Sequence, residues 1–433
     1  MNSLSDFVIE GEVLIKYTGH DSYVVIPECV KEIYCYAFAY CNNIKTLDTA
    51  NVQKIGIGAF LGCTNLELAD LHDVKTIAGG AFSQCRNLCS VNIPVIEAAS
   101  GDCFDGTPWY DSLSDEFCVF GDGVLIKCNT GLNMNLNEDT ILNIPDNVKY
   151  VAGFYQQWHK LQIVNMPSVL KIGPSAFEGC YSLERVNMPN VVSIGTEAFN
   201  ECYNLKSVYM PKVSEIGGSC FTKTTFHEEI LKDEFCILGD GVLVKYNGHD
   251  EEVTIPDEVK FISGFASGYT ENLDVRKIII PKALTIGRKS MINCDRLEEV
   301  EMPEATEIEE CAFGGNCCLM EVSMPEVRKI GSWAFYRTEL EEVNAPSARY
   351  IDRDAFVNCD YLEYADFPNA EFVCDEAFKE CLALQKVNLP KAKTILNGVF
   401  SGCKMLTEVN IPDDAGVGED AFDGCTFSED SDL

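Results

Sequence analysis

Residues 176–199 read Ala-Phe-Glu-Gly-Cys-Tyr-Ser-Leu-Glu-Arg-Val-Asn-Met-Pro-Asn-Val-Val-Ser-Ile-Gly-Thr-Glu-Ala-Phe, so an Ala-Phe pair recurs after 22 residues. The alternation of Val186, Asn187 and Met188 predicts a short strand that ends at the proline. We expect Phe199 to fill the core from the opposite wall. A single unit of this kind cannot bury its apolar side chains alone, so neighbouring units must stack.

The same period runs through most of the chain. Phenylalanines separated by 22 residues, with one step of 21, are Phe38, Phe60, Phe82 and Phe104; Phe177, Phe199 and Phe221; and Phe313, Phe335, Phe356, Phe378, Phe400 and Phe422. Aligning the units on their strand ends gives sixteen coils. A period in the low twenties is typical of a leucine-rich-repeat solenoid.

A second element interrupts the repeats. Residues 117–127 read Phe-Cys-Val-Phe-Gly-Asp-Gly-Val-Leu-Ile-Lys, residues 235–245 are nearly the same, and residues 7–16 are a variant. Asp-Gly between two apolar runs predicts a β-hairpin.

Each hairpin is expected to open a block of repeats. The predicted blocks are residues 1–110, 111–228 and 229–433, which together form a continuous solenoid ending in a short acidic tail at residues 428–432.

The hairpin followed by an Ile-Pro strand, and the recurrent Ile-Gly-x-x-Ala-Phe-x-x-Cys-x-x-Leu-x-x-Val-x-x-Pro, resemble the BspA-like leucine-rich repeats over about residues 6–425. The resemblance implies a right-handed superhelix with a parallel β-sheet on one face and short irregular or helical turns on the other. It also implies a protein of the cell surface, acting in adhesion or host interaction, and no catalytic residues.

Composition narrows the possible partners. Asp and Glu outnumber Lys and Arg by 68 to 33, giving a formal charge of −35, which disfavours nucleic acid and anionic membranes. No run reaches the roughly 18 apolar residues that cross a membrane. Met1–Asp6 shows no basic segment followed by an apolar core, so the sequence predicts no signal peptide. The compartment is therefore open between the cell surface and the cytoplasm.

The 22 cysteines suggest metal binding or disulfides at first sight, but ten share one repeat position. These are Cys41, Cys63, Cys85, Cys180, Cys202, Cys294, Cys359, Cys381, Cys403 and Cys425. There is no Cys-x-x-Cys, and equivalent side chains of adjacent coils point the same way, so we expect buried, reduced thiols and no metal or other cofactor. Of the adjacent Cys317 and Cys318, one is expected to fill a core position and the other to be exposed.

No hydrolase or nucleotide-binding signature is present, which predicts that the protein is not an enzyme. Trp109, in Thr-Pro-Trp-Tyr, lies where a coil gives way to a hairpin. It is expected to seal that junction, with an exposed ligand platform as the alternative.

One residue per strand is expected to face outward from the sheet, and ten of these sixteen are Asn or Asp. We predict a binding site at Asn143, Asn165, Asn187 and Tyr209, where amides and an aromatic ring would meet an extended protein or glycan ligand of unknown identity. Ile279 also interrupts the polar row. The alternatives are a solvated polar face and a monomer that serves only as a structural spacer.

The segment Leu297–Glu310 contains seven glutamates. Stacked carboxylates are expected to repel one another, which water and salt, a cation or a basic partner would offset.

Overall fold

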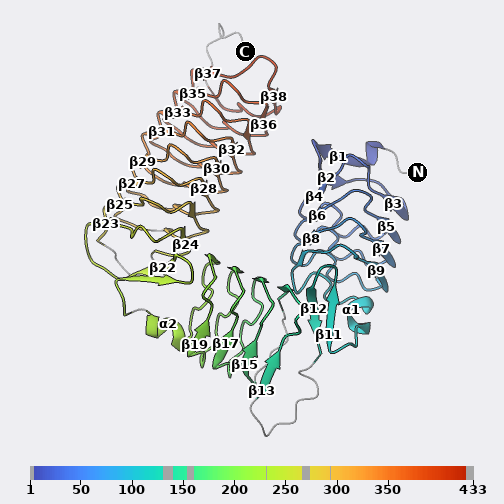
Figure 1. Ribbon diagram of the computed structural model, residues 1–433. Coiled ribbons are helices and arrows are strands. Elements are labelled where there is room, and N and C mark those ends of the chain that lie inside the picture. The colour runs from blue at the N-terminus through green and yellow to red at the C-terminus, as the bar shows by residue number, and fades with distance from the viewer. Residues whose placement is uncertain are drawn as a thin grey trace. The chain divides into compact units, whose positions relative to one another are not determined.

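The structure, a computed structural model, describes residues 4–129, 140–153, 160–230, 232–265, 274–292 and 294–425. The chain divides into two compact units, residues 1–213 with 219–229 and residues 214–218 with 230–433. In each unit the chain winds into coils whose short strands stack side by side (Figure 1). The predicted repeat solenoid is therefore the fold of both units.

The first wall of each coil is a strand of three to five residues that pairs in parallel with the strand of a neighbouring coil. These strands are β3 (Tyr23–Val25), β5 (Thr46–Asp48), β7 (Leu68–Asp70), β9 (Ser90–Asn92), β13 (Thr140–Asn143), β15 (Leu161–Asn165), β17 (Arg185–Asn187), β19 (Ser207–Tyr209), β23 (Glu252–Thr254), β25 (Lys277–Ile279), β27 (Glu299–Glu301), β29 (Glu321–Ser323), β31 (Glu342–Asn344), β33 (Tyr364–Asp366), β35 (Lys386–Asn388) and β37 (Glu408–Asn410). They form four sheets of four strands, so the described residues contain the sixteen predicted coils.

The second wall is a ladder of two-residue strands that the sequence analysis did not predict. They are β4 (Glu32–Ile33), β6 (Lys54–Ile55), β8 (Thr76–Ile77), β10 (Ala98–Ala99), β14 (Tyr150–Val151), β16 (Lys171–Ile172), β18 (Ser193–Ile194), β20 (Glu215–Ile216), β24 (Phe261–Ile262), β26 (Thr285–Ile286), β28 (Glu307–Ile308), β30 (Lys329–Ile330), β32 (Tyr350–Ile351), β34 (Phe372–Val373), β36 (Thr394–Ile395) and β38 (Gly416–Val417). A two-residue strand is too short to show alternation, so hydrophobic periodicity gives no signal for it.

The three predicted hairpins are confirmed. They are β1 (Phe7–Glu10) with β2 (Val13–Tyr17), β11 (Phe117–Phe120) with β12 (Val124–Cys128), and β21 (Phe235–Leu238) with β22 (Val242–Tyr246). The second strand of each hairpin starts a second-wall ladder by pairing in parallel with the next coil. The remaining elements are a 3-10 turn (Leu4–Asp6) and two short helices, α1 (Pro108–Ser112) and α2 (Thr225–Ile230). The three-block division stays a prediction, and the acidic tail lies outside the described residues.

The third wall consists of tight turns around the repeated phenylalanine. Around Phe378 the residues two positions before and after it, Glu376 and Glu380, have φ of 57° and 56°. The backbone N–H of Phe378 donates to Val399 O of the next coil at 2.9 Å. Such left-handed residues cost roughly 1 kcal/mol each outside glycine, so the turn depends on these inter-coil bonds and on the buried ring.

The phenylalanine rings stack into a spine inside each unit. The ring of Phe356 lies 5.3 Å from that of Phe335 and 5.1 Å from that of Phe378, nearly parallel to both. Stacked pairs of this kind contribute about 0.5–1.5 kcal/mol beyond the area that they bury. Each ring is therefore stabilised mainly by the coils on either side of it.

An aromatic side chain closes the spine where a coil gives way to a hairpin. Trp109 of α1 is buried, with its ring 4.7 Å from that of Phe104 and 5.5 Å from that of Phe120. Thr107 caps the helix by accepting the Tyr110 N–H. The predicted junction role of Trp109 is confirmed, and burial excludes it as a ligand platform.

The repeated cysteine position is part of the core. Cys63, Cys85, Cys180, Cys202, Cys294, Cys359, Cys381 and Cys403 are buried, whereas Cys41 and Cys425, toward the ends of the two units, are half-buried. The Cys381 thiol donates to Phe356 O, and the Cys403 thiol donates to Phe378 O, both at 3.1 Å. Burial raises the pKa of Cys294 to about 12. These thiols thus bind the turn of the preceding coil and are shielded from reagents.

The expectation for Cys317 and Cys318 is confirmed only in part, because one of them is exposed but neither fills the core. Cys317 is exposed and Cys318 is half-buried, so neither fills the core position. Asn316 occupies it instead, fully buried, and its Nδ2 donates to Met291 O at 2.9 Å. The amide satisfies the same kind of backbone acceptor that a cysteine serves in other coils.

The 21-residue step has a structural consequence. The coil between β29 and β31 is one residue shorter, and the first wall divides into separate sheets there. The second wall remains paired across the same step, with Lys329 opposite Tyr350.

We predict that thiol labelling of the native protein at pH 8 modifies Cys29, Cys89 and Cys317 first, because these three are exposed. Labelling after denaturation should reach all 22 cysteines. Mass spectrometry of peptides distinguishes the sites. Rapid modification of Cys63 or Cys381 in native protein would contradict the buried position of the thiol ladder.

Candidate binding face

The outer face of the first wall presents two side chains per coil. In β17 the side chain of Val186 is fully buried, while Arg185 is exposed and Asn187 is half-buried on the outer face. The sequence analysis identified only the position of Asn187. Extending the alternation by one residue toward the N-terminus would have found Arg185 and its equivalents.

The structure brings the four predicted site residues together. Asn143 lies opposite Asn165, Asn165 opposite Asn187, and Asn187 opposite Tyr209, on the adjacent strands β13, β15, β17 and β19. We call this row the middle-block face. Because parallel strands lie about 4.8 Å apart, it offers one polar or aromatic group at each strand spacing.

Amide side chains of this row bond to one another. The Asn165 Nδ2 donates to Asn143 Oδ1 at 2.8 Å. A carboxamide carries two N–H groups and a carbonyl with two lone pairs, so this bond orients the amide and leaves further donors and acceptors for a ligand.

The amide ladder is a general property of the repeat. In the second unit Asn388 donates to Asp366 at 2.6 Å, and Asn410 donates to Asn388 at 2.6 Å. The same geometry therefore also serves to keep a polar sheet face ordered and solvated, away from the middle block.

Tyr209 is the feature that distinguishes the middle-block face. Its side chain is 58% exposed at the end of a four-strand sheet, whereas Ile279, the other predicted interruption, is half-buried. Tyrosine combines a rigid apolar ring with a hydroxyl group and is enriched where binding energy is concentrated. Of the two side chains, Tyr209 offers the larger contact area.

Most of the carboxylates in Leu297–Glu310, for which water and salt, a cation or a basic partner were expected to offset repulsion, pair with basic residues of neighbouring coils. Lys277 Nζ lies 2.8 Å from Glu299 and 2.5 Å from Glu301. Hydrogen bonds to these two glutamates raise the pKa of Lys277. Further pairs join Arg276 to Glu298, Lys282 to Glu304, Arg288 to Glu310 and Lys329 to Glu307.

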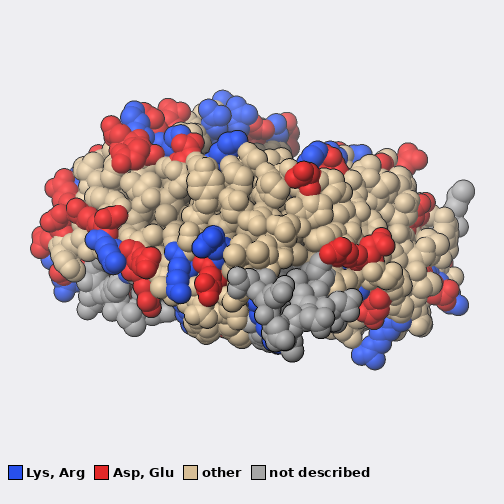
Figure 2. Space-filling model, turned by 60° about the horizontal axis from the view of Figure 1, so that its bottom comes forward, with Lys and Arg blue, Asp and Glu red and all other residues tan. Residues whose placement is uncertain are grey.

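The cations come from the coils on either side of the acidic one, mostly 22 residues away. On the face of the molecule drawn in Figure 2, basic and acidic side chains also lie next to one another. Within the described ranges no group of three or more His, Cys, Asp or Glu is arranged to hold a metal ion. Nor does any described helix have the length and apolar character needed to cross a membrane.

The outer face of the first wall thus combines hydrogen-bond donors, hydrogen-bond acceptors and an aromatic ring. The described residues of this face include no cluster of reactive groups. The chain folds as a solenoid of stacked coils, with two β-walls and a spine of phenylalanine rings. This architecture places it in the class of leucine-rich-repeat proteins. The chain matches the BspA type leucine rich repeat region, in six copies, over residues 16–114, 134–247, 244–363 and 328–431. It belongs to that family, as its sequence motifs predicted.

Several solved structures with similar chains are bacterial leucine-rich-repeat proteins. A leucine rich cell surface protein from Faecalibacterium prausnitzii is 20% identical, with 94% of this chain and 92% of that chain covered and a TM-score of 0.28. A leucine-rich repeat protein from Bacteroides ovatus is 20% identical, with coverages of 97% and 92% and a TM-score of 0.26. One from Eubacterium ventriosum is 16% identical, with coverages of 98% and 92% and a TM-score of 0.36. No curated protein sequence matches this chain.

We predict that Tyr209→Ala and Asn165→Ala change the free energy of unfolding by no more than about 0.5 kcal/mol, because both side chains point outward from the sheet and not into the core. Val186→Ala, on the inner face of the same sheet, should cost about 2 kcal/mol through lost burial and the cavity left behind. Urea denaturation followed by circular dichroism measures all three. Equal losses would mean that the faces are assigned wrongly.

Proposed function

We propose that the protein is a non-catalytic interaction scaffold that binds an extended protein or glycan ligand along the middle-block face. Leucine-rich-repeat solenoids are generally binding scaffolds, which supports the general part of this proposal. The observation that carries the specific part is the in-register row of Asn143, Asn165 and Asn187 ending at the exposed ring of Tyr209.

The chemistry of the row suits a ligand with repeated hydrogen-bonding groups. Each strand contributes one amide, and an extended partner lying across the strands meets these groups at regular intervals. The neighbouring outward residues, Arg185 and Ser207, widen the polar surface on the same strands. Tyr209 supplies an apolar contact at low entropic cost because its side chain has few rotatable bonds.

A role in adhesion or host interaction at a cell surface belongs to the same proposal and rests on the family resemblance alone. The protein acts as a monomer in this proposal, since one chain contains the complete row. Neither a cofactor nor a metal ion takes part.

The second candidate is a structural spacer whose repeats supply only length. The amide ladder of the second unit supports it, because Asn388 and Asn410 show that the repeat builds such ladders away from the middle block. The two candidates differ in whether substitutions on the middle-block face have a special effect.

The test compares two triple variants. Asn165→Lys, Asn187→Lys and Tyr209→Ala together change the middle-block face, and Asn388→Lys, Asn410→Lys and Tyr364→Ala make matched changes on the second unit. Both should keep the wild-type circular dichroism spectrum. After an array of glycans and extracellular-matrix proteins identifies a ligand of the wild type, the first variant should bind it at least tenfold more weakly, or about 1.4 kcal/mol.

The second variant should bind that ligand with wild-type affinity. Unchanged binding by the first variant, or an equal loss in both, would overturn the middle-block assignment. Absence of any ligand for the wild type on the array would favour the spacer.

A further inference from the structure

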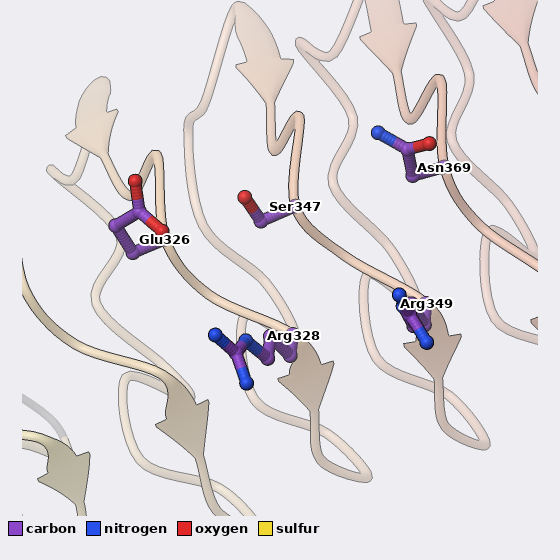
Figure 3. Close-up of a pocket in the computed structure, with 5 residues that line it drawn as sticks. All are labelled: Glu326, Arg328, Ser347, Arg349 and Asn369. Carbon is purple, nitrogen blue, oxygen red and sulfur yellow. The ribbon is translucent and has the colours of Figure 1, made fainter.

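A shallow groove of about 420 Å³ lies at a corner of the second unit, between the first and second walls. It is lined by Glu326, Arg328, Ser347, Arg349 and Asn369, which come from three successive coils (Figure 3). The groove lies on a different unit from the middle-block face, and none of these residues belongs to that face. Its volume is in the range of sites for small molecules.

Two arginines line this groove one coil apart. The Arg349 N–H donates to Arg328 O at 2.9 Å, so the backbones of the two arginines are fixed side by side just before β32 and β30. Both side chains are exposed. Among the described residues neither guanidinium makes a hydrogen bond or a close ion pair, although the pKa of Glu371 is lowered by the hydrogen bond from Lys393 and also by the charge of Arg349.

This lack of partners differs from the surrounding surface. In neighbouring coils most cations pair with a carboxylate or an amide of the next coil, as Lys282 does with Glu304 and Lys393 with Glu371. Lys391 donates to Asn369 at 2.6 Å, and Asn369 donates to Pro346 O at 2.7 Å, so the amide at the end of the groove is fixed. Inter-coil side-chain pairs also reach the coils of the two arginines, where Lys329 pairs with Glu307, but among the described residues they do not include Arg328 or Arg349.

Two of the remaining lining residues supply a hydroxyl group and a carboxylate, which can accept hydrogen bonds. The Ser347 hydroxyl and the Glu326 carboxylate have no side-chain partner within the described part of the chain. An ionised carboxylate only accepts hydrogen bonds, so a ligand that satisfies Glu326 must carry donors of its own. A simple anion such as phosphate brings more negative charge and fewer hydroxyl donors to Glu326 than a sugar does.

We propose that this groove binds a carboxylate-bearing sugar of the uronic acid type. The sugar carboxylate lies between Arg328 and Arg349, because guanidinium groups form paired hydrogen bonds with planar carboxylates. The sugar hydroxyls donate to Glu326 and exchange hydrogen bonds with Ser347 and Asn369. This site is independent of the proposed function, since it uses other residues on the other unit.

The binding test uses labelled tri-galacturonate and its neutral counterpart, trigalactose, in fluorescence polarisation with the full chain. Wild-type protein should bind the acidic trimer and not the neutral one, and more weakly at higher salt because screening weakens exposed charges. Arg328→Gln with Arg349→Gln should weaken binding at least tenfold. The matched control, Arg276→Gln with Arg296→Gln, removes the same charge elsewhere in the unit and should bind as the wild type does.

A further variant separates a sugar site from a general anion site. Glu326→Ala should weaken binding of tri-galacturonate, because a hydroxyl acceptor is lost, and strengthen binding of inorganic phosphate, because a negative charge is removed. The proposal is overturned if the acidic trimer does not bind at millimolar concentration, or if the double arginine variant binds it as well as the control. Equal binding of a polyglutamate peptide and tri-galacturonate by the wild type would overturn the assignment to a sugar.

Discussion

The structure depends on the stacking of each coil on the next at a fixed repeat length. Backbone hydrogen bonds join successive coils along all three walls, and the phenylalanine of each turn packs on the same residue one coil away. These contacts form together only if each coil returns the chain to the same position. The one-residue-shorter coil before β31 shows the constraint, since the first wall divides there while the second wall continues.

Repetition with a fixed length also determines the surface. Side chains 22 residues apart become neighbours on adjacent coils. A polar or charged residue in one coil can therefore pair with the equivalent residue of the next coil. The pairs of Arg276 with Glu298 and of Asn388 with Asn410 arise in this way. Exposed ion pairs contribute little individually. In the coils around the corner groove most described cations nevertheless have an acidic or amide partner, and Arg328 and Arg349 do not.

Much of the fold could be predicted from the sequence because the strongest signals repeat. The phenylalanine spine, the buried cysteine position, the sixteen strands and the hairpins all follow from residues that recur at equivalent positions. The second wall could not be predicted, because strands such as Lys54–Ile55 are too short to show a period. The repeat alignment places Asn316 at the cysteine position, so neither Cys317 nor Cys318 should have been assigned to the core.

The candidate sites also differ in how far the sequence predicts them. The row from Asn143 to Tyr209 follows from strand alternation, whereas its inter-coil hydrogen bonds need the register between strands. The partners of the acidic segment could not be predicted from the segment itself, because the basic residues lie in the neighbouring coils. Arg328 and Arg349 have no distinctive local sequence, and only stacking brings them together.

The most direct test of the stacking account is a pair of internal deletions in the second unit. Removal of residues 357–378 takes out one repeat of 22 residues and joins Phe356 to Lys379, so every later coil keeps its register. Removal of residues 357–367 takes out half a repeat, so the first-wall strands of the later coils would lie against the turns of the earlier ones. We expect the longer deletion to keep a cooperative unfolding transition and a β-type circular dichroism spectrum, and the shorter one to lose both for the second unit. A shorter deletion that is tolerated as well as the longer one would contradict the account.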